Sequence, residues 1–164
     1  MIVISDKEKA PIQAAAFDFI ISILDKNYHW PHTFGDNHLI VRFEDTEHPT
    51  EKEHQAQFFG VNRILSWVKA NNITSDHRVL VHCHAGVSRS AAIAWLLLID
   101  QGVDPKEAFQ SLFKARPCIW PNTNIMAIGD RLMGKQGEIA KLAHSIDLEI
   151  IQNRQCSGYS DYGG

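Results

Sequence analysis

Three short segments of the chain are apolar at nearly every position and stand between stretches that are mostly polar. They are residues 19–24, 39–43 and 79–83, and a shorter apolar stretch at 2–4 is a candidate for a further strand. Near-continuous apolar runs of this length are typical of strands that are buried on both faces of a parallel sheet. The pattern therefore predicts a compact α/β fold in which a largely parallel central sheet is flanked by helices.

Apolar residues also recur at helical spacing between these segments. In the stretch 53–71 they stand three or four positions apart, at Phe58, Val61, Leu65 and Val68. This stretch is therefore predicted to be a helix with one buried face. The stretch 90–101 is apolar nearly all round, as a central buried helix is, and Gly102 is placed to end it. The other predicted helices are 104–115, 124–133 and 136–146.

The chain has no internal repeat and no linker that would divide its 164 residues. A chain of this length is typical of one domain with its own core. The last residues are polar and rich in glycine, a composition that favours disorder. We expect a single domain over 1–152 and a flexible tail over 153–164.

Composition and charge narrow the classes of function. The net charge is −3, which argues against a nucleic-acid binder, because such proteins are usually basic. The chain has only 3 cysteines, an odd and sparse count that indicates a reducing compartment rather than a disulfide framework. No signal-peptide pattern is present, and the longest apolar run, 91–99, is too short to span a bilayer. We expect a soluble, cytoplasmic, monomeric protein with no nucleic-acid or membrane partner.

The segment with the clearest chemistry joins the last predicted strand to the central helix. It reads Val81-His82-Cys83-His84-Ala85-Gly86-Val87-Ser88-Arg89-Ser90. A cysteine at the end of this strand faces the N-terminus of the helix, whose free N–H groups and partial positive charge stabilise both a thiolate and a bound phosphate. Arg89 adds a planar, permanently charged fork that can bind two phosphate oxygens. The segment therefore predicts a phosphate site with Cys83 as its nucleophile.

His-Cys, five further residues and then Arg-Ser resemble the signature of the cysteine-based protein tyrosine phosphatases. The Ala-Gly-Val-Ser filling of the loop resembles the dual-specificity branch, and the resemblance extends over roughly 19–133. It implies that Cys83 attacks phosphorus, that Ser90 assists departure of the thiolate, and that His82 orders the loop from behind. The residues implied to bind the substrate phosphate are His84, Ala85, Gly86, Val87, Ser88 and Arg89.

The same resemblance implies a general acid on a loop that follows a strand upstream of the cysteine. Asp45 fits this place, 38 positions before Cys83, and Glu44, Glu47 and Asp36 are its rivals. An acidic residue after a strand is also common in ordinary solvated turns.

A second implied site residue is Asn122, which lies in a Pro-Asn step that similar enzymes place near the phosphate loop. The alternative for Asn122 is a plain N-cap of the following helix. Cys118 is either a disulfide partner for Cys83 under oxidation or an ordinary loop cysteine.

A metal site is not expected, although His82, Cys83 and His84 are consecutive. Neighbouring side chains at a strand end point in different directions, and zinc ligands are usually spaced apart. The other histidines are expected at the surface or in turns: His29, His32, His38, His48, His54, His77 and His144. The aromatic stretch 28–32 is expected to be a surface turn, with the rim of the site as its alternative. No cofactor is expected either.

The combined features predict a phosphatase that hydrolyses phosphate monoesters through a phosphocysteine intermediate. The loop interior has no Lys or Arg before Arg89, whereas highly charged substrates usually need extra cations. Phosphorylated protein, with phosphotyrosine and also phosphoserine or phosphothreonine, is therefore preferred over a phosphoinositide or an RNA 5′ end. A phosphate-binding module without catalysis remains the alternative of another class.

Overall fold

The centre of the molecule is a sheet of four parallel strands, seen in a computed structural model that describes residues 1–153. The strands are β1 (Ile2–Ser5), β2 (Phe19–Leu24), β3 (His38–Arg42) and β4 (Val79–His82), in the spatial order β1-β4-β2-β3. Every residue of β2 and β4 is buried, as expected for the inner strands of a covered parallel sheet. The predicted α/β fold is confirmed, and the candidate strand at 2–4 is part of β1.

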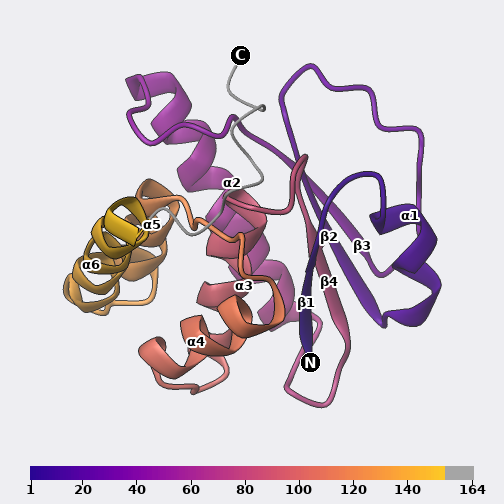
Figure 1. Cartoon of the computed structure of the whole chain (residues 1–164). Coiled ribbons are helices and arrows are strands. Elements are labelled where there is room, and N and C mark those ends of the chain that lie inside the picture. Colours follow the sequence, from indigo (N-terminus) through magenta and orange to yellow (C-terminus); the bar gives the residue numbers. More distant parts are fainter. Residues whose placement is uncertain (154–164) are drawn as a thin grey trace.

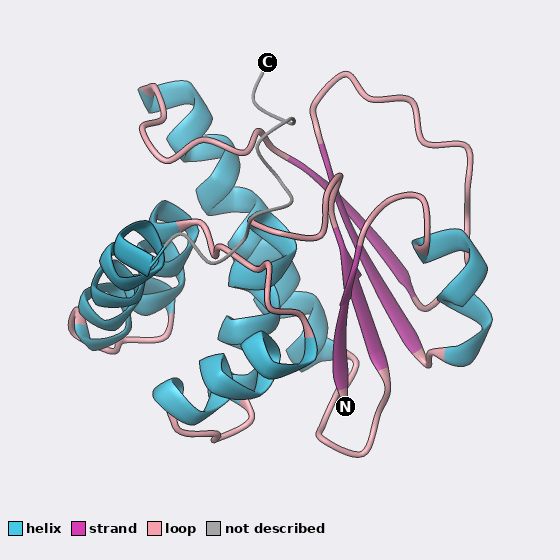
Figure 2. Ribbon diagram, viewed as in Figure 1, coloured by secondary structure: helices cyan, strands magenta, loops and turns pink. Residues whose placement is uncertain are grey.

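Five helices gather on one face of the sheet, to the left in Figure 1 and in cyan in Figure 2. They are α2 (Glu51–Ala70), α3 (Arg89–Asp100), α4 (Pro105–Ala115), α5 (Thr123–Leu132) and α6 (Glu138–Asn153). Ten of the 12 residues of α3 are buried, and Trp95 at its middle is 0% exposed. The predicted central helix is thus confirmed, and its burial fixes the position of its N-terminus at the edge of the sheet.

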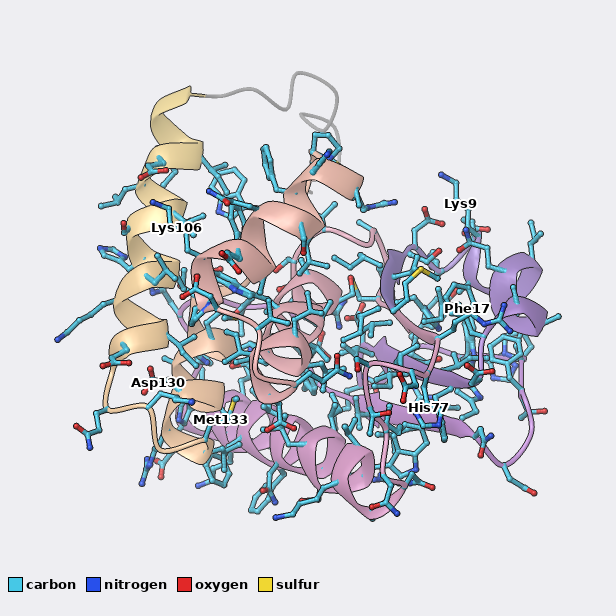
Figure 3. All side chains as sticks on the ribbon, turned by 90° about the horizontal axis from the view of Figure 1, so that it is seen from below. Lys9, Phe17, His77, Lys106, Asp130 and Met133 are labelled. Atoms are coloured by element: carbon cyan, nitrogen blue, oxygen red, sulfur yellow. The ribbon has the colours of Figure 1, made fainter. Side chains whose placement is uncertain are left out.

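The opposite face is covered by a short segment that the apolar pattern did not predict. It consists of α1 (Ala10–Gln13) and the 3-10 turn η1 (Ala14–Ala16), to the right of the strands in Figure 1. Ala10 and Ala14 pack there with Ile20 and Leu80 of the sheet, beside the partly buried Phe17, which Figure 3 labels on this side. A helix of 4 residues is little longer than one turn, so it leaves no periodic signal.

Local hydrogen bonds move two helix boundaries from their predicted positions. Thr50 and Glu53 form a capping box, so α2 begins at Glu51 rather than at 53. Asp130, labelled in Figure 3, is 4% exposed and accepts hydrogen bonds from the backbone N–H groups of Gly137 and Ile139, both at 2.7 Å. This carboxylate holds the start of α6 at Glu138 rather than at the predicted 136. The helix also runs beyond its predicted end at 146, to Asn153.

The segment predicted as a tail, 153–164, lies outside the described residues except for Asn153, the last residue of α6. Within the described range 1–153, none of the helices has both the length and the apolar character that crossing a membrane requires.

Candidate active site

The carboxyl ends of all four strands lie at one edge of the sheet, because the strands are parallel. Asp25 follows β2, Phe43 and Asp45 follow β3, and Cys83 follows β4. Since β2 lies between β3 and β4, groups that are far apart in the sequence converge beside the N-terminus of α3. Ligand sites of α/β folds commonly lie at this edge.

The loop 83–89, called the cysteine loop below, holds its carbonyl groups outward. Four consecutive carbonyl oxygens accept hydrogen bonds from other segments: His84 from Lys7 N–H (3.1 Å), Ala85 and Gly86 from Arg116 (2.9 and 2.8 Å), and Val87 from Trp120 N–H (2.9 Å). In a planar trans peptide, the N–H group of the next residue points opposite to the carbonyl. The N–H groups of residues 85–88 therefore point to the inner side of the loop, where they can bind an anion.

Gly86 is required for this shape on two counts. Its φ is +69°, a conformation that residues with a Cβ rarely adopt, and a Cβ at this position would lie 2.6 Å from the carbonyl oxygen of Ser5. Arg116, which follows α4, was not predicted as a site residue. No local signal marks it, because its role depends on the loop lying across the chain from it.

Cys83 lies at the base of this loop and faces the first turn of α3. Its side chain is 2% exposed, and Sγ lies 3.1 Å from Oγ of Ser90, which is itself fully buried. Ser88 occupies the N-cap position of α3, but its side chain makes no capping hydrogen bond and instead donates to Asp45. The N-terminus of α3 is thus left without a side-chain cap, which favours an anion there.

Arg89 is the first residue of α3, and its side chain is 3% exposed. Its Nη1 donates to Asp25 Oδ1 at 2.6 Å and to the carbonyl oxygen of Phe43 at 2.8 Å. Its Nε is buried and has no hydrogen-bond partner among residues 1–153, with Asp45 Oδ2 at 3.7 Å. A buried charged donor without a partner is costly, so the Nε edge of the guanidinium is suited to an incoming phosphate.

Among the four acidic candidates, the structure places Asp45 beside the cysteine loop. Asp45 Oδ1 accepts hydrogen bonds from Ser88 Oγ at 2.7 Å and from Asn122 Nδ2 at 2.9 Å. Glu44 instead accepts from the backbone of Lys26, and Glu47 from Thr123 at the start of α5. Asp36 lies exposed in the segment between β2 and β3.

Asn122 combines the two roles that the sequence left open. Its Oδ1 caps α5 by accepting from Ile125 N–H at 3.0 Å, while its Nδ2 holds Asp45. The side chain is fully buried, so the cap and the contact with the carboxylate are fixed together.

Asp25 belongs to this group of residues and was not predicted. Besides its contact with Arg89, its Oδ2 lies 3.3 Å from Nε2 of His84. Burial lowers the pKa of His84 and outweighs the attraction of Asp25, which favours the neutral form of the imidazole. The signal was available: an acidic residue directly after a buried parallel strand must lie at the same edge as Cys83.

The aromatic stretch 28–32 contacts the site and is not a plain surface turn. The ring of Tyr28 packs against His84 with 4.6 Å between ring centroids, and Lys7 Nζ lies 4.8 Å from the centroid of Tyr28. The ring of Trp30 lies 4.9 Å from that of His82. Tyr28 thus stands at the rim of the cysteine loop, whereas Trp30 covers the histidine behind it.

The prediction that His38 is a surface or turn residue is wrong. His38 is the first residue of β3, is half-buried, and hydrogen-bonds to Ser22 of the neighbouring strand.

Cys83 and Cys118 are both free thiols, and Cys118 is half-buried.

A parallel sheet in which the loop after the inner strand β4 carries Cys83, with Arg89 at the start of the following helix, is the fold of the cysteine-based tyrosine phosphatases. The family model for the catalytic domain of dual specificity phosphatases matches residues 3–128, and the chain belongs to that family. The resemblance drawn from the cysteine loop is thereby confirmed.

Curated relatives match a little over half of the chain. Dual specificity protein phosphatase 2 of Homo sapiens is 37% identical over 95 residues, which are 55% of this chain and 29% of that protein. Dual specificity protein phosphatase 1-B of Xenopus laevis is 34% identical over 93 residues, 55% of this chain and 25% of that protein. The chain therefore spans only about a quarter of the length of these relatives.

Solved structures support the fold. The crystal structure of a mouse putative dual specificity phosphatase complexed with zinc tungstate superposes with a TM-score of 0.62. It covers 87% of this chain and 86% of that one at 20% identity, a level at which the likeness concerns the fold alone.

Proposed function

We propose that this protein is a phosphatase that hydrolyses phosphate monoesters of proteins, with Cys83 as the nucleophile. The observation that carries the proposal is the cysteine loop, whose carbonyl groups from His84 to Val87 are all bound from outside. The inward N–H groups, the N-terminus of α3 and the Nε edge of Arg89 then converge beside one buried thiol. These donors suit the three non-bridging oxygens of a phosphate and the charge that builds up on them during transfer.

In the first step, the Cys83 thiolate attacks phosphorus in line. The S–P bond forms, the P–O bond to the leaving group breaks, and Asp45 gives its proton to the departing oxygen. Ser88 and Asn122 hold the Asp45 carboxyl group beside the loop for this purpose.

In the second step, water attacks the phosphocysteine and passes its proton to Asp45. The S–P bond breaks, inorganic phosphate is released, and the thiolate is regenerated. Ser90 Oγ, at 3.1 Å from Sγ, can donate a hydrogen bond to the departing thiolate. The charge on phosphate is balanced by Arg89 and the loop N–H groups, so the cycle uses no metal or cofactor.

Phosphotyrosine, and also phosphoserine or phosphothreonine, of protein substrates fit the charges around the loop best. Lys7 stands at the rim beside Tyr28, whereas the carboxyl groups of Asp25, Glu44 and Asp45 lie nearby. A multiply phosphorylated lipid headgroup or an RNA 5′ end would meet these carboxylates. The proposal includes a reducing, cytoplasmic setting, because the thiolate must stay reduced to act. It also includes a monomer without nucleic-acid or membrane partners.

The first test is hydrolysis of p-nitrophenyl phosphate in the presence of EDTA and a thiol reductant. Vanadate-sensitive turnover is expected, and Cys83→Ser should abolish it while the variant still binds vanadate or phosphate. Cys118→Ser is the matched control, because Cys118 is also a free cysteine but lies outside the loop. Turnover that survives Cys83→Ser would refute the nucleophile. Binding of phosphate without any turnover by the wild type would instead support a phosphate-binding module.

The role of Asp45 is tested by the leaving group of the substrate. Asp45→Asn should lower kcat by about 10²–10⁴-fold, the usual contribution of a general acid, and most strongly for alkyl phosphates with poor leaving groups. Glu44→Gln is the control, since Glu44 points to the backbone of Lys26. An unchanged rate of Asp45→Asn on such substrates would remove Asp45 from the mechanism.

A further inference from the structure

A chain of four hydrogen bonds connects the segment before β3 with the carbonyl group of Cys83. Phe34 N–H donates to His38 Nδ1 at 3.3 Å, and His38 Nε2 lies 2.7 Å from Ser22 Oγ. Ser22 Oγ lies 2.6 Å from His82 Nε2, and His82 Nδ1 lies 3.4 Å from the carbonyl oxygen of Cys83. The chain thus crosses from β3 through β2 to β4 and ends at the residue that carries the thiol.

The first donor and the last acceptor of this series of hydrogen bonds determine the direction of every hydrogen bond in it. A backbone N–H group only donates, so His38 Nδ1 accepts, and the proton of this neutral ring is on Nε2, which donates to Ser22. A carbonyl oxygen only accepts, so His82 Nδ1 carries the proton of its ring, and its Nε2 accepts from the Ser22 hydroxyl. Ser22 therefore accepts one hydrogen bond and donates the other, and no two donors or acceptors face each other.

Burial favours the neutral form of both rings, which this arrangement requires. It lowers the pKa of His38, and it lowers the pKa of His82 to about 4. Ser22 and His82 are both 0% exposed, and hydrogen bonds are stronger in such surroundings than at a surface.

We infer that Ser22 and His38 are positioning residues of the active site. They hold His82 in the tautomer that donates to the carbonyl of Cys83 and so keep this carbonyl turned away from the thiolate. Without the Ser22 hydroxyl, the other tautomer of His82 becomes accessible, and its Nδ1 lone pair would then face the carbonyl oxygen. The inference rests on the proposed function in one respect, namely that Cys83 acts as a thiolate.

The sheet offers a matched control for Ser22. Ser5 and Ser22 are the two residues that pair with His82 in the register of the neighbouring strands, one on each side. Ser5 is 1% exposed, and its hydroxyl donates to Gln13 Oε1 at 2.6 Å rather than to the histidine. Ser5→Ala therefore removes a buried hydroxyl beside His82 without touching the chain of hydrogen bonds.

The direct test is the tautomer of His82, read from the ¹⁵N chemical shifts of its ring nitrogens in the chain of residues 1–164. The wild type and Ser5→Ala should show a proton on Nδ1, and Ser22→Ala should show a mixture or the Nε2 tautomer. Ser22→Thr keeps a hydroxyl and should restore the wild-type pattern. His38→Gln keeps a donor toward Ser22 and should also preserve it, whereas His38→Leu should not.

The functional test is the pH profile of Cys83 alkylation by iodoacetamide, together with kcat and KM on p-nitrophenyl phosphate. In Ser22→Ala, the midpoint of the alkylation profile should move to higher pH. The kcat should fall about fivefold, which is the effect of losing about one net hydrogen bond, and KM should change little. Ser5→Ala should change neither quantity.

Tautomer and alkylation are both measured without turnover, so they separate this inference from the proposed function. An Nδ1 tautomer and an unshifted alkylation profile in both Ser22→Ala and His38→Leu would overturn it. The His38 variants keep this test open if Ser22→Ala does not fold, because His38 is only half-buried. A wild type with the expected tautomer and no phosphatase activity would refute the proposed function alone.

Discussion

Burial of His82 predicts that the protein loses stability in mild acid. The pKa of His82 is lowered from 6.5 to about 4, first because burial disfavours the charged ring and further because His38 and His84 lie nearby. In the unfolded chain the same ring titrates near its ordinary value. The folded protein therefore has its full stability from this group above pH 6.5 and loses it as the pH falls toward 4, because the unfolded state binds the proton more readily.

The size of the effect follows from the two pKa values. At pH 5 the ring is protonated in the unfolded chain and still neutral in the folded one. The free energy of unfolding then falls by about 1.4 kcal/mol for each pH unit below 6.5, which is on the order of 2 kcal/mol at pH 5. This is a measurable part of the 5–15 kcal/mol by which domains are typically stable.

The assay is urea unfolding at pH 7.5 and pH 5, for the wild type and for His82→Asn. Asparagine keeps a hydrogen-bond donor near the Nδ1 position but does not titrate. The variant should be less stable at pH 7.5, yet it should lose about 2 kcal/mol less than the wild type between the two pH values. Titratable groups that do not interact with His82 titrate alike in both proteins and cancel in this comparison. An identical loss in the two proteins would show that His82 is already charged in the folded state, and would refute the reasoning.

Substitutions at Asp25 and Gly60, each with a control variant, test how Arg89 is positioned. Asp25→Ala should lower kcat/KM on aryl phosphates by about tenfold, because Nη1 of Arg89 loses a charged hydrogen bond. Asp25→Asn keeps an acceptor oxygen and should lower kcat/KM less. A rise in activity would show that the Asp25 carboxylate mainly repels phosphate. Gly60→Ala places a Cβ against the ring of Phe43, whose carbonyl binds Arg89, while Gly129→Ala meets only a leucine side chain on α3. Both glycine variants should lose about 1–3 kcal/mol of stability in thermal denaturation. Only Gly60→Ala should also lower kcat, because it displaces Phe43, whose carbonyl binds Arg89. Equal kcat values in the two variants would contradict this role of Phe43.

Local pattern was sufficient to predict the sheet, the central helix and the loop between them. The apolar runs of β2 and β4 and the apolar circumference of α3 are properties of contiguous residues, and burial on both sides is their common cause. Cys83 and Arg89 are also close in the sequence, so their spacing and the strand-to-helix context were readable together. The short helix α1 was missed because 4 residues carry no period.

Tertiary structure alone decided which distant residues surround that loop. Arg89 meets Asp25 across 64 positions, and His82 meets Ser22 across 60. The sequence left four acidic residues as candidates for the general acid. Only the position of β3 beside β2 in the sheet brings Asp45, which follows β3, to Ser88 and Asn122. Such pairings depend on strand order and on the direction of each side chain, and a one-residue shift of register would turn Ser22 away from His82. The chain thus encodes Cys83 and Arg89 of the candidate site locally, whereas the groups that contact Arg89 and His82 are assembled only by the fold.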